Sequence, residues 1–340
     1  MKPLIYLKTS SKYNDFELVE VKKTIEDALI DNNQIYSNAP ISNDFDVAHF
    51  FNLDDVSFYS NYFKKVKKVV SLFFSEEDFK GNFLKEASGE NKLINLKYEV
   101  SLIDKKILNK VDLIYVPSND AKNFLINLGI ETKIKVMELP IDFKKFNLKN
   151  NILEKAIYSY LRLSEDKFLT VTTIKNKDDI ALEKLIYLAN KFDQITFIVI
   201  SQFSSESFLP LKFKNLLKYK PKNVIFTKPL TYDLYFSLMY NAKIYLNLNS
   251  LPGNILEIYE AMASKTQIFA LESSIFKDIL IDKKNCYLYN NIDSLRIGID
   301  QYYYNLIDST CANAYEEISK RDSKTLGKEL INDYLNITED

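Results

Sequence analysis

Residues 245–271 read YLNLNSLPGNILEIYEAMASKTQIFAL, and this segment decides the fold. Two short apolar runs enclose a Pro-Gly turn and an amphipathic stretch, which predicts strand, tight turn, helix and second strand. Such a turn places backbone N–H groups and the positive end of a helix beside a pocket, which suits a phosphate group. Gly253, Asn254 and Ile255 are therefore candidates to bind a phosphate, and a plain turn is the alternative.

Two acidic residues follow this turn. Asn254 is a plausible N-cap, and Glu257, three residues on, is more consistent with a capping-box partner than with a catalytic group. Glu260 lies one turn into the predicted helix, close enough to meet a ligand held at the N-terminus. The alternative for Glu260 is a surface carboxylate that pairs with a side chain four residues away.

The rest of the chain alternates short apolar runs with amphipathic stretches, as in βα units with parallel sheets. Helices are expected at Phe16–Ile30, from Ser118 to Gly129, at Asp178–Phe192, and at about Ala312–Tyr334. Strands are expected at Leu4–Leu7, Asp46–Phe50, Val69–Phe74, Asp112–Pro117, Ile134–Leu139, Phe168–Ile174, Ile195–Ser201, Val224–Lys228, Lys243–Asn247, Gln267–Leu271 and Cys286–Tyr289.

A polar break at Phe143–Asn151 divides this pattern into two doubly wound units. Two such units facing each other bind ligands in the crevice at the carboxyl ends of their strands. Asp142 is expected at the end of the last strand of the first unit, where it would reach the crevice or serve as a turn residue. His49 is expected in the core or at the edge of the crevice.

Composition excludes several classes of protein. The chain has 340 residues, 46% of them hydrophobic and 27% charged, which suits two globular domains. Its net charge of −1 gives no global field that would attract nucleic acid. Two cysteines and one histidine argue against a disulfide framework and against a Cys/His zinc site. The sequence shows no membrane-spanning run and no signal-peptide pattern, so a cytoplasmic protein is expected.

Five motifs, in this order and spacing, resemble those of the GT-B glycosyltransferases of the retaining family 4, and the glycolipid (diglycosyl-diacylglycerol) hexosyltransferases of bacteria most of all. The resemblance covers nearly the whole chain. The motifs are FDVAHF at Phe45–Phe50, VDLIYVPS at Val111–Ser118, LPIDFKKF at Leu139–Phe146, PKNVIFT at Pro221–Thr227 and YEAMA at Tyr259–Ala263.

The resemblance implies an α/β protein of the GT-B type with two Rossmann-like domains. Residues 1–150 would form the acceptor domain, residues 151–311 the nucleotide-sugar domain, and residues 312–340 a helix that crosses back to the first domain. The implied reaction is transfer of a hexose, with retention and without a metal or other cofactor, from a nucleoside-diphosphate sugar, in particular a UDP-sugar. The acceptor would be a lipid, a glycolipid or another surface glycan.

By the same resemblance, Glu260 would accept hydrogen bonds from the ribose hydroxyls of the donor. Lys175 and Lys177 would neutralise the diphosphate, where departure of the nucleotide concentrates negative charge, although two lysines are also common in a solvated loop. The sequence identifies no catalytic residue.

Departures from the family pattern leave a second hypothesis open. Pro252 stands where the family has its first glutamate, and the loop Thr9–Asn14 lacks the usual glycines. A degenerate GT-B protein that binds or scaffolds a partner would tolerate these changes. Phosphorolysis of a phospho-sugar is a third hypothesis, but no lysine arrangement specific for it is visible.

The basic and aromatic stretch Tyr62–Lys68 is a candidate membrane surface. Lys64, Lys65, Lys67 and Lys68 alternate with apolar residues, as on proteins that contact anionic lipid at the inner face of a membrane. The alternative is a solvated face packed on the core. Binding of nucleic acid by these lysines is not expected, because no recognisable module accompanies them.

Overall fold

The structure is a computed structural model of the chain. It describes residues 1–8, 16–40, 44–59, 62–72, 83–86, 95–98, 102–146, 151–174, 178–200, 211–248, 255–272 and 279–339.

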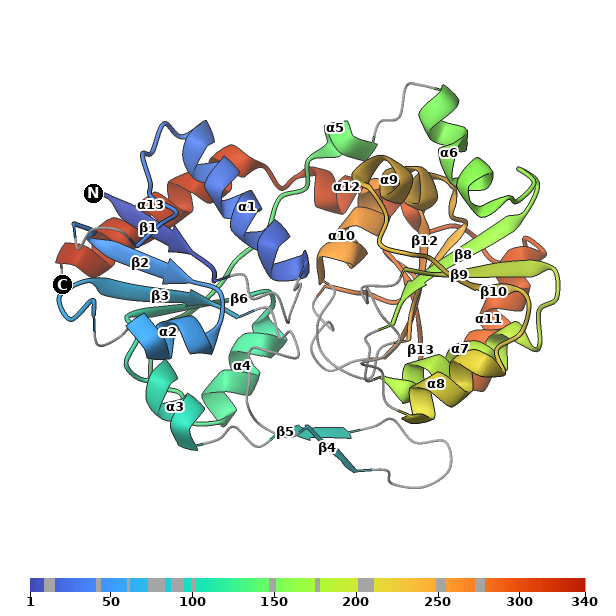
Figure 1. The fold of residues 1–340 in the computed structure, drawn as a ribbon, viewed down its shortest axis with the longest axis horizontal. Helices are drawn as coiled ribbons and strands as arrows, with labels where there is room; N and C mark the ends of the chain where they lie inside the picture. The colour runs from blue at the N-terminus through green and yellow to red at the C-terminus, as the bar shows by residue number, and fades with distance from the viewer. Residues whose placement is uncertain are drawn as a thin grey trace.

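The first domain is built on a parallel sheet of five strands in the order β1-β2-β3-β6-β7. The four-residue strand β2 is completely buried, which explains its continuous apolar run around His49. Helices α1 and α13 cover one face of the sheet, and α2, α3 and α4 cover the other (Figure 1). The strands are β1 (Pro3–Tyr6), β2 (Val47–Phe50), β3 (Lys67–Ser71), β6 (Leu113–Val116) and β7 (Ile134–Val136), and the helices are α1 (Phe16–Asp31), α2 (Leu53–Tyr59), α3 (Leu102–Leu108), α4 (Asn119–Asn127) and α13 (Ser323–Glu339).

The second domain is built on a parallel sheet of six strands in the order β10-β9-β8-β11-β12-β13. Helices α7, α8 and α11 bury one face, while α9 and α10 bury the other. The strands are β8 (Phe168–Thr173), β9 (Ile195–Ile200), β10 (Val224–Phe226), β11 (Ile244–Asn247), β12 (Gln267–Leu271) and β13 (Tyr287–Tyr289), and the helices are α7 (Asp179–Ala189), α8 (Leu211–Lys218), α9 (Tyr232–Asn241), α10 (Ile255–Ala263) and α11 (Ile292–Tyr303).

Two short segments join or extend these domains. Helices α5 (Phe143–Phe146) and α6 (Asn151–Leu161) lie between the two sheets in sequence, so the predicted polar break contains a helical turn. Strands β4 (Phe83–Glu86) and β5 (Asn95–Tyr98) form an antiparallel pair outside both sheets. This pair was not predicted, because four-residue strands give too short a pattern to distinguish from a solvated stretch.

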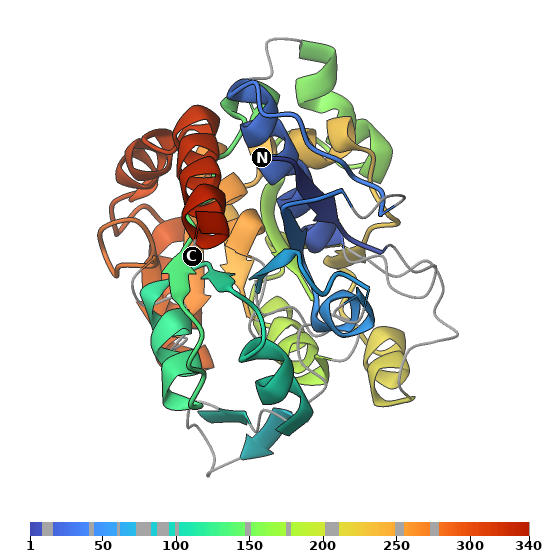
Figure 2. The ribbon, with the colours of Figure 1, turned by 90° about the vertical axis from the view of Figure 1, so that its left-hand side faces the viewer.

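The C-terminal segment is two helices, where the sequence predicted one at about Ala312–Tyr334. Helix α12 (Cys311–Ser319) packs on α10 of the second domain, and α13 packs on α1 of the first. The break has a local cause, because the Asp322 side chain accepts a hydrogen bond from the backbone N–H of Thr325 at 2.8 Å and starts a new helix. Figure 2 shows α13 near the front of the molecule, on the first domain.

Helices α1 and α13 approach so closely that only glycine fits at residue 327. A Cβ atom there would lie 2.1 Å from the carbonyl oxygen of Ala28 and 2.1 Å from Nδ2 of Asn32. Asn32 also donates a hydrogen bond to the carbonyl oxygen of Lys324 at 3.0 Å.

The predicted GT-B architecture, two Rossmann-like domains with a C-terminal helix that crosses back to the first, is confirmed.

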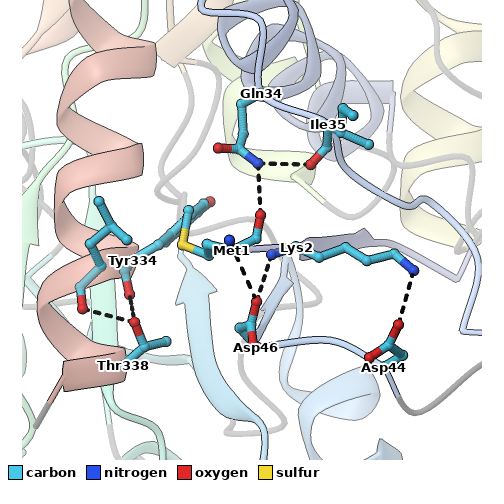
Figure 3. Close-up of polar contacts among 9 residues, drawn as sticks. Met1, Lys2, Gln34, Ile35, Asp44, Asp46, Tyr334 and Thr338 are labelled. Atoms are coloured by element: carbon cyan, nitrogen blue, oxygen red, sulfur yellow. Dashed lines mark hydrogen bonds and ion pairs between the residues drawn. The ribbon is translucent and has the colours of Figure 1, made fainter.

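The start of β1 is held by polar contacts near the same helix. Asp46 accepts a hydrogen bond from the backbone N–H of Lys2 at 2.6 Å, and Gln34 donates to the carbonyl oxygen of Met1 at 3.0 Å (Figure 3). In α13, Thr338 donates to the carbonyl oxygen of Tyr334 at 3.0 Å. The first two contacts hold the start of β1, and the third lies within α13, the helix beside it.

Candidate functional site

The strand order of the second sheet reverses between β8 and β11, and this reversal marks the candidate site. In open α/β sheets, ligands bind outside the carboxyl ends of the strands at such a switch point. Ile244 pairs with Thr170 and Tyr245 with Val171, so the two strands end side by side at Thr173 and Asn247. The chain leaves β8 toward Lys175 and Lys177, and it leaves β11 toward Gly253 and Asn254. These four predicted site residues lie outside the described residues.

Helix α10 presents two carboxylates at this edge. Most of its residues are buried, whereas Glu257 and Glu260, three residues apart on one face, are only partly buried. Ile255, the first residue of the helix, has a completely buried side chain. The predicted role of its backbone N–H in binding phosphate stays a prediction.

Each of these carboxylates accepts a hydrogen bond from a tyrosine. The Tyr245 hydroxyl on β11 donates to Oε2 of Glu257 at 2.8 Å, and the Tyr235 hydroxyl on α9 donates to Oε2 of Glu260. Glu257 is therefore bonded across to the sheet, which the capping-box interpretation did not include. Burial, reinforced by Glu260 and Glu257, holds the pKa of Tyr235 well above its ordinary value, so its hydroxyl keeps its proton.

Helix α1 of the first domain reaches the same region. Tyr232, one turn before Tyr235 on α9, donates a hydrogen bond to Glu20 of α1. Lys23 lies over the Tyr232 ring, with Nζ 5.7 Å from the centroid. Burial, together with Glu20 and Glu260, raises the pKa of Tyr232. Glu260, Tyr235, Tyr232 and Glu20 thus form one group of side chains between the domains, here called the Glu260 cluster.

Strand β8 carries three buried hydroxyl groups, on Thr170, Thr172 and Thr173, that have no hydrogen-bond partner among the described residues. An unsatisfied buried hydroxyl costs free energy of about 1–3 kcal/mol. Thr173 is the last residue of the strand. By the pairing register, it shares a face of the sheet with Asn247 at the end of β11.

His49 lies in the core of the first domain, away from solvent. Its side chain is 0% exposed, with Nδ1 2.6 Å from the Tyr334 hydroxyl and Nε2 2.7 Å from the Ser71 hydroxyl. Burial lowers its pKa to about 3, so the ring is neutral. His49, Ser71 and Tyr334 are here called the His49 cluster. Because both ring nitrogens are bonded within the protein, the geometry favours a core role over the crevice role.

Two neighbouring polar groups extend the His49 cluster along α13. The Tyr115 hydroxyl on β6 donates to Oδ2 of Asp333 at 2.7 Å, and Lys135 of β7 forms an ion pair with the same carboxylate. Asp333 is nearly completely buried. These bonds fasten α13 to three strands of the first sheet.

Asp142 does not end a strand. Strand β7 ends at Val136, and Asp142 is an exposed residue immediately before α5. The premise that placed it at the crevice is therefore wrong, because the predicted strand Ile134–Leu139 is only three residues long. Contact between Asp142 and a ligand stays a prediction.

The four lysines of the candidate membrane surface differ in their environments. Lys64 and Lys65 are exposed, whereas Lys67 lies 3.4 Å from Asp112 and Lys68 donates to the carbonyl oxygen of Val66 at 3.1 Å. Burial lowers the pKa of Lys68. Beside them, Phe58 and Tyr62 are 55% and 65% exposed and stack at 5.6 Å. No helix in the described part of the chain combines the length and apolar composition that crossing a membrane requires.

Comparison with known proteins shows the fold. No protein-family model matches the chain, and no curated protein matches its sequence significantly. The structure of Anabaena Alr3699/HepE in complex with UDP-glucose is similar over 99% of this chain and 100% of that one, with a TM-score of 0.70 and 13% identity. Sucrose-phosphate synthase from Thermosynechococcus elongatus is similar over 86% of this chain and 73% of its own, with a TM-score of 0.69 and 12% identity.

A third structure, a glycosyltransferase from Rickettsia africae, is similar over 97% of this chain and 84% of its own, with a TM-score of 0.63 and 16% identity. At these identities the likeness concerns architecture, and the GT-B fold is the conclusion it supports.

The sequence predicted Glu260 from the helix in which it lies, but it gave no sign of Tyr235, Tyr245 or Tyr232. Tyr235 is 25 residues from Glu260 and Tyr245 is 12 residues from Glu257. Tyr232 is 212 residues from Glu20. The chain has 23 tyrosines, so their presence alone carried no signal.

Proposed function

We propose that this protein is a glycosyltransferase that transfers a hexose from a UDP-linked donor to a lipid, a glycolipid or another surface glycan, with retention and without a metal. The observation that carries the proposal is the place of Glu260. It is a partly buried carboxylate on the helix that follows the strand at the switch point of the second sheet. A carboxylate there suits the ribose hydroxyls of a nucleotide, because it accepts hydrogen bonds from both members of a diol.

The similar structures support the choice of donor. One of them is described in complex with UDP-glucose, another is named a glycosyltransferase, and trehalose-6-phosphate from E. coli is described as bound with UDP-2-fluoro glucose. In the mechanism that the family resemblance implies, the bond from the sugar C1 to the UDP oxygen breaks and a bond from C1 to the acceptor oxygen forms. The departing phosphate oxygen takes the proton of the acceptor hydroxyl.

Calorimetric titration with UDP, and with GDP for comparison, tests the donor site. We expect UDP to bind wild type with micromolar affinity, and Glu260→Gln to weaken binding by about tenfold or more, because a neutral amide is a poorer acceptor for a diol. Glu316→Gln is the matched control, because Glu316 is an exposed carboxylate on α12 and should leave affinity unchanged.

Transfer is tested separately, with UDP-glucose and UDP-galactose on vesicles of anionic lipid and diacylglycerol glycolipid. A glycosylated product, together with UDP binding, supports the enzyme. Absence of UDP and GDP binding by folded wild type would refute the donor site and favour the degenerate protein that binds a partner, for which Pro252 and the glycine-free loop 9–14 are the sequence features.

The proposed contact with a membrane is tested with the same vesicles. The double variant Lys64→Glu/Lys65→Glu should lower the fraction of protein that co-sediments with them.

A further inference from the structure

Tyr235 holds the carboxylate of Glu260 from a different helix. Its hydroxyl donates to Oε2 of Glu260, and its ring lies 5.6 Å from the ring of Phe236. Tyr235 also packs against the small apolar cluster of Phe146, Phe236 and Ala263. Because this packing restrains the ring, the position of its hydroxyl is fixed by the fold before any ligand binds.

The direction of this hydrogen bond is set by electrostatics. Tyr235 faces two carboxylates, Glu260 and Glu257, and both raise the pKa of its hydroxyl, in addition to burial. A phenol in these surroundings keeps its proton, and its O–H donates a hydrogen bond to a carboxylate oxygen. A hydrogen bond to a charged group is stronger than one between neutral groups, so it restricts the rotamers of Glu260.

From this geometry we infer that Tyr235 is a positioning residue, which orients Glu260 to accept hydrogen bonds from the vicinal hydroxyls of the ribose in a nucleoside diphosphate. The inference rests on the proposed function. A carboxylate has about four lone-pair positions, so it can accept hydrogen bonds from a phenol and from a diol at the same time. Without the phenol, the glutamate side chain would lose one of the contacts that order it, and more of its ordering would fall to the ligand, which weakens binding.

A ligand that lacks the diol separates this role from a general structural one. UDP and 2′,3′-dideoxyuridine 5′-diphosphate differ only at the two ribose hydroxyls. We expect wild type to bind UDP about tenfold tighter than the dideoxy compound, since the dideoxy compound leaves the carboxylate of Glu260 without the two hydroxyl donors in the bound complex. In Tyr235→Phe, which keeps the ring, this ratio should fall to about twofold. In Glu260→Gln it should approach one.

Tyr240→Phe is the matched control. It removes a hydroxyl from an exposed tyrosine on the same helix, and the ratio should stay at the wild-type value. Thermal unfolding of each variant establishes that it is folded before titration.

The outcomes distinguish failure of the positioning role of Tyr235 from failure of the proposed function. A Tyr235→Phe variant that weakens both ligands by the same factor, or that keeps the wild-type ratio, refutes the positioning role while leaving the donor site intact. A wild type that binds UDP without preferring it to the dideoxy compound also refutes it. A folded wild type that binds neither ligand refutes the proposed function, and the positioning role with it.

Discussion

The His49 cluster and the Glu260 cluster are built from similar groups but differ in what they leave accessible. Each contains an ionisable side chain that bonds to a tyrosine hydroxyl from a distant part of the chain. In the His49 cluster the ring is completely buried and both of its nitrogens are bonded. In the Glu260 cluster the carboxylate is only partly buried, and Tyr232 is 45% exposed.

This difference separates a structural polar cluster from a candidate binding site. Polar atoms that are removed from water need partners within the protein, and the His49 cluster supplies them to its histidine ring. A polar group that keeps contact with solvent can exchange water for a ligand. Changes in the first cluster should therefore alter stability, whereas changes in the second should alter binding and alter stability little.

The largest expected effect is that of Tyr334→Ala in the His49 cluster. It removes a completely buried aromatic ring and leaves one nitrogen of His49 without a partner. We expect the free energy of unfolding to fall by about 4 kcal/mol, as for other buried aromatic truncations. Urea denaturation measures it, with Leu335→Ala, at an exposed neighbouring residue, as the control. A loss of less than about 1 kcal/mol would contradict the conclusion that the His49 cluster is a buried, structural cluster.

A smaller effect is expected from pH, through the same histidine. The pKa of His49 is lowered to about 3 in the folded protein, from 6.5 in the unfolded chain. Between these values the unfolded chain binds a proton that the folded protein does not, so stability falls as the pH falls below 6.5. At pH 5 the loss relative to pH 7 should be about 2 kcal/mol.

His49→Gln isolates this contribution, because His49 is the only histidine and the variant keeps every acidic residue of wild type. Denaturation of both proteins at pH 7 and pH 5 should show that wild type loses about 2 kcal/mol more than the variant. Equal losses would mean that the ring is accessible to protons in the folded protein.

The smallest expected effect lies in the Glu260 cluster, at the contact between the domains. A double-mutant cycle of Glu20→Gln and Tyr232→Phe measures the coupling between the two side chains. Because this hydrogen bond is partly exposed, we expect a coupling below about 1 kcal/mol in the free energy of unfolding. A coupling above about 2 kcal/mol would mean that this contact stabilises the fold in the way that the buried His49 cluster does.

Local pattern was enough to predict the strands of the two main sheets, whereas the GT-B arrangement and the C-terminal helix that crosses back came from the family resemblance. Each strand of the two main sheets falls within or beside a predicted range, because buried parallel strands are short apolar runs. The N-cap at Ser118 is confirmed, since its side chain accepts a hydrogen bond from the backbone N–H of Ala121 at 3.0 Å. The break at Asp322 was missed, because a charged turn between two amphipathic helices keeps an approximate helical period.

The candidate site was less predictable, because its partners are distant in sequence. Glu260 was predicted from its place one turn into its helix and from the family resemblance of Tyr259–Ala263. Tyr235, in contrast, contacts it only because α9 and α10 lie together in the fold. For His49, local sequence left the core and the crevice open, and Tyr334, 285 residues later, supplies the contact that favours the core.

The close contact between α1 and α13 has a consequence for synthesis. Asn32 and Lys324 are 292 residues apart, so the ribosome needs roughly 15 to 60 s to make the second after the first, at about 5–20 residues per second. Leu330 and Ile337 of α13 belong to the same core cluster as the apolar residues of α1. During this interval α13 has not been made, so it cannot cover the apolar face of α1. Gly327 allows α13 to pack closely on α1. It is therefore one of the late residues that complete the first domain.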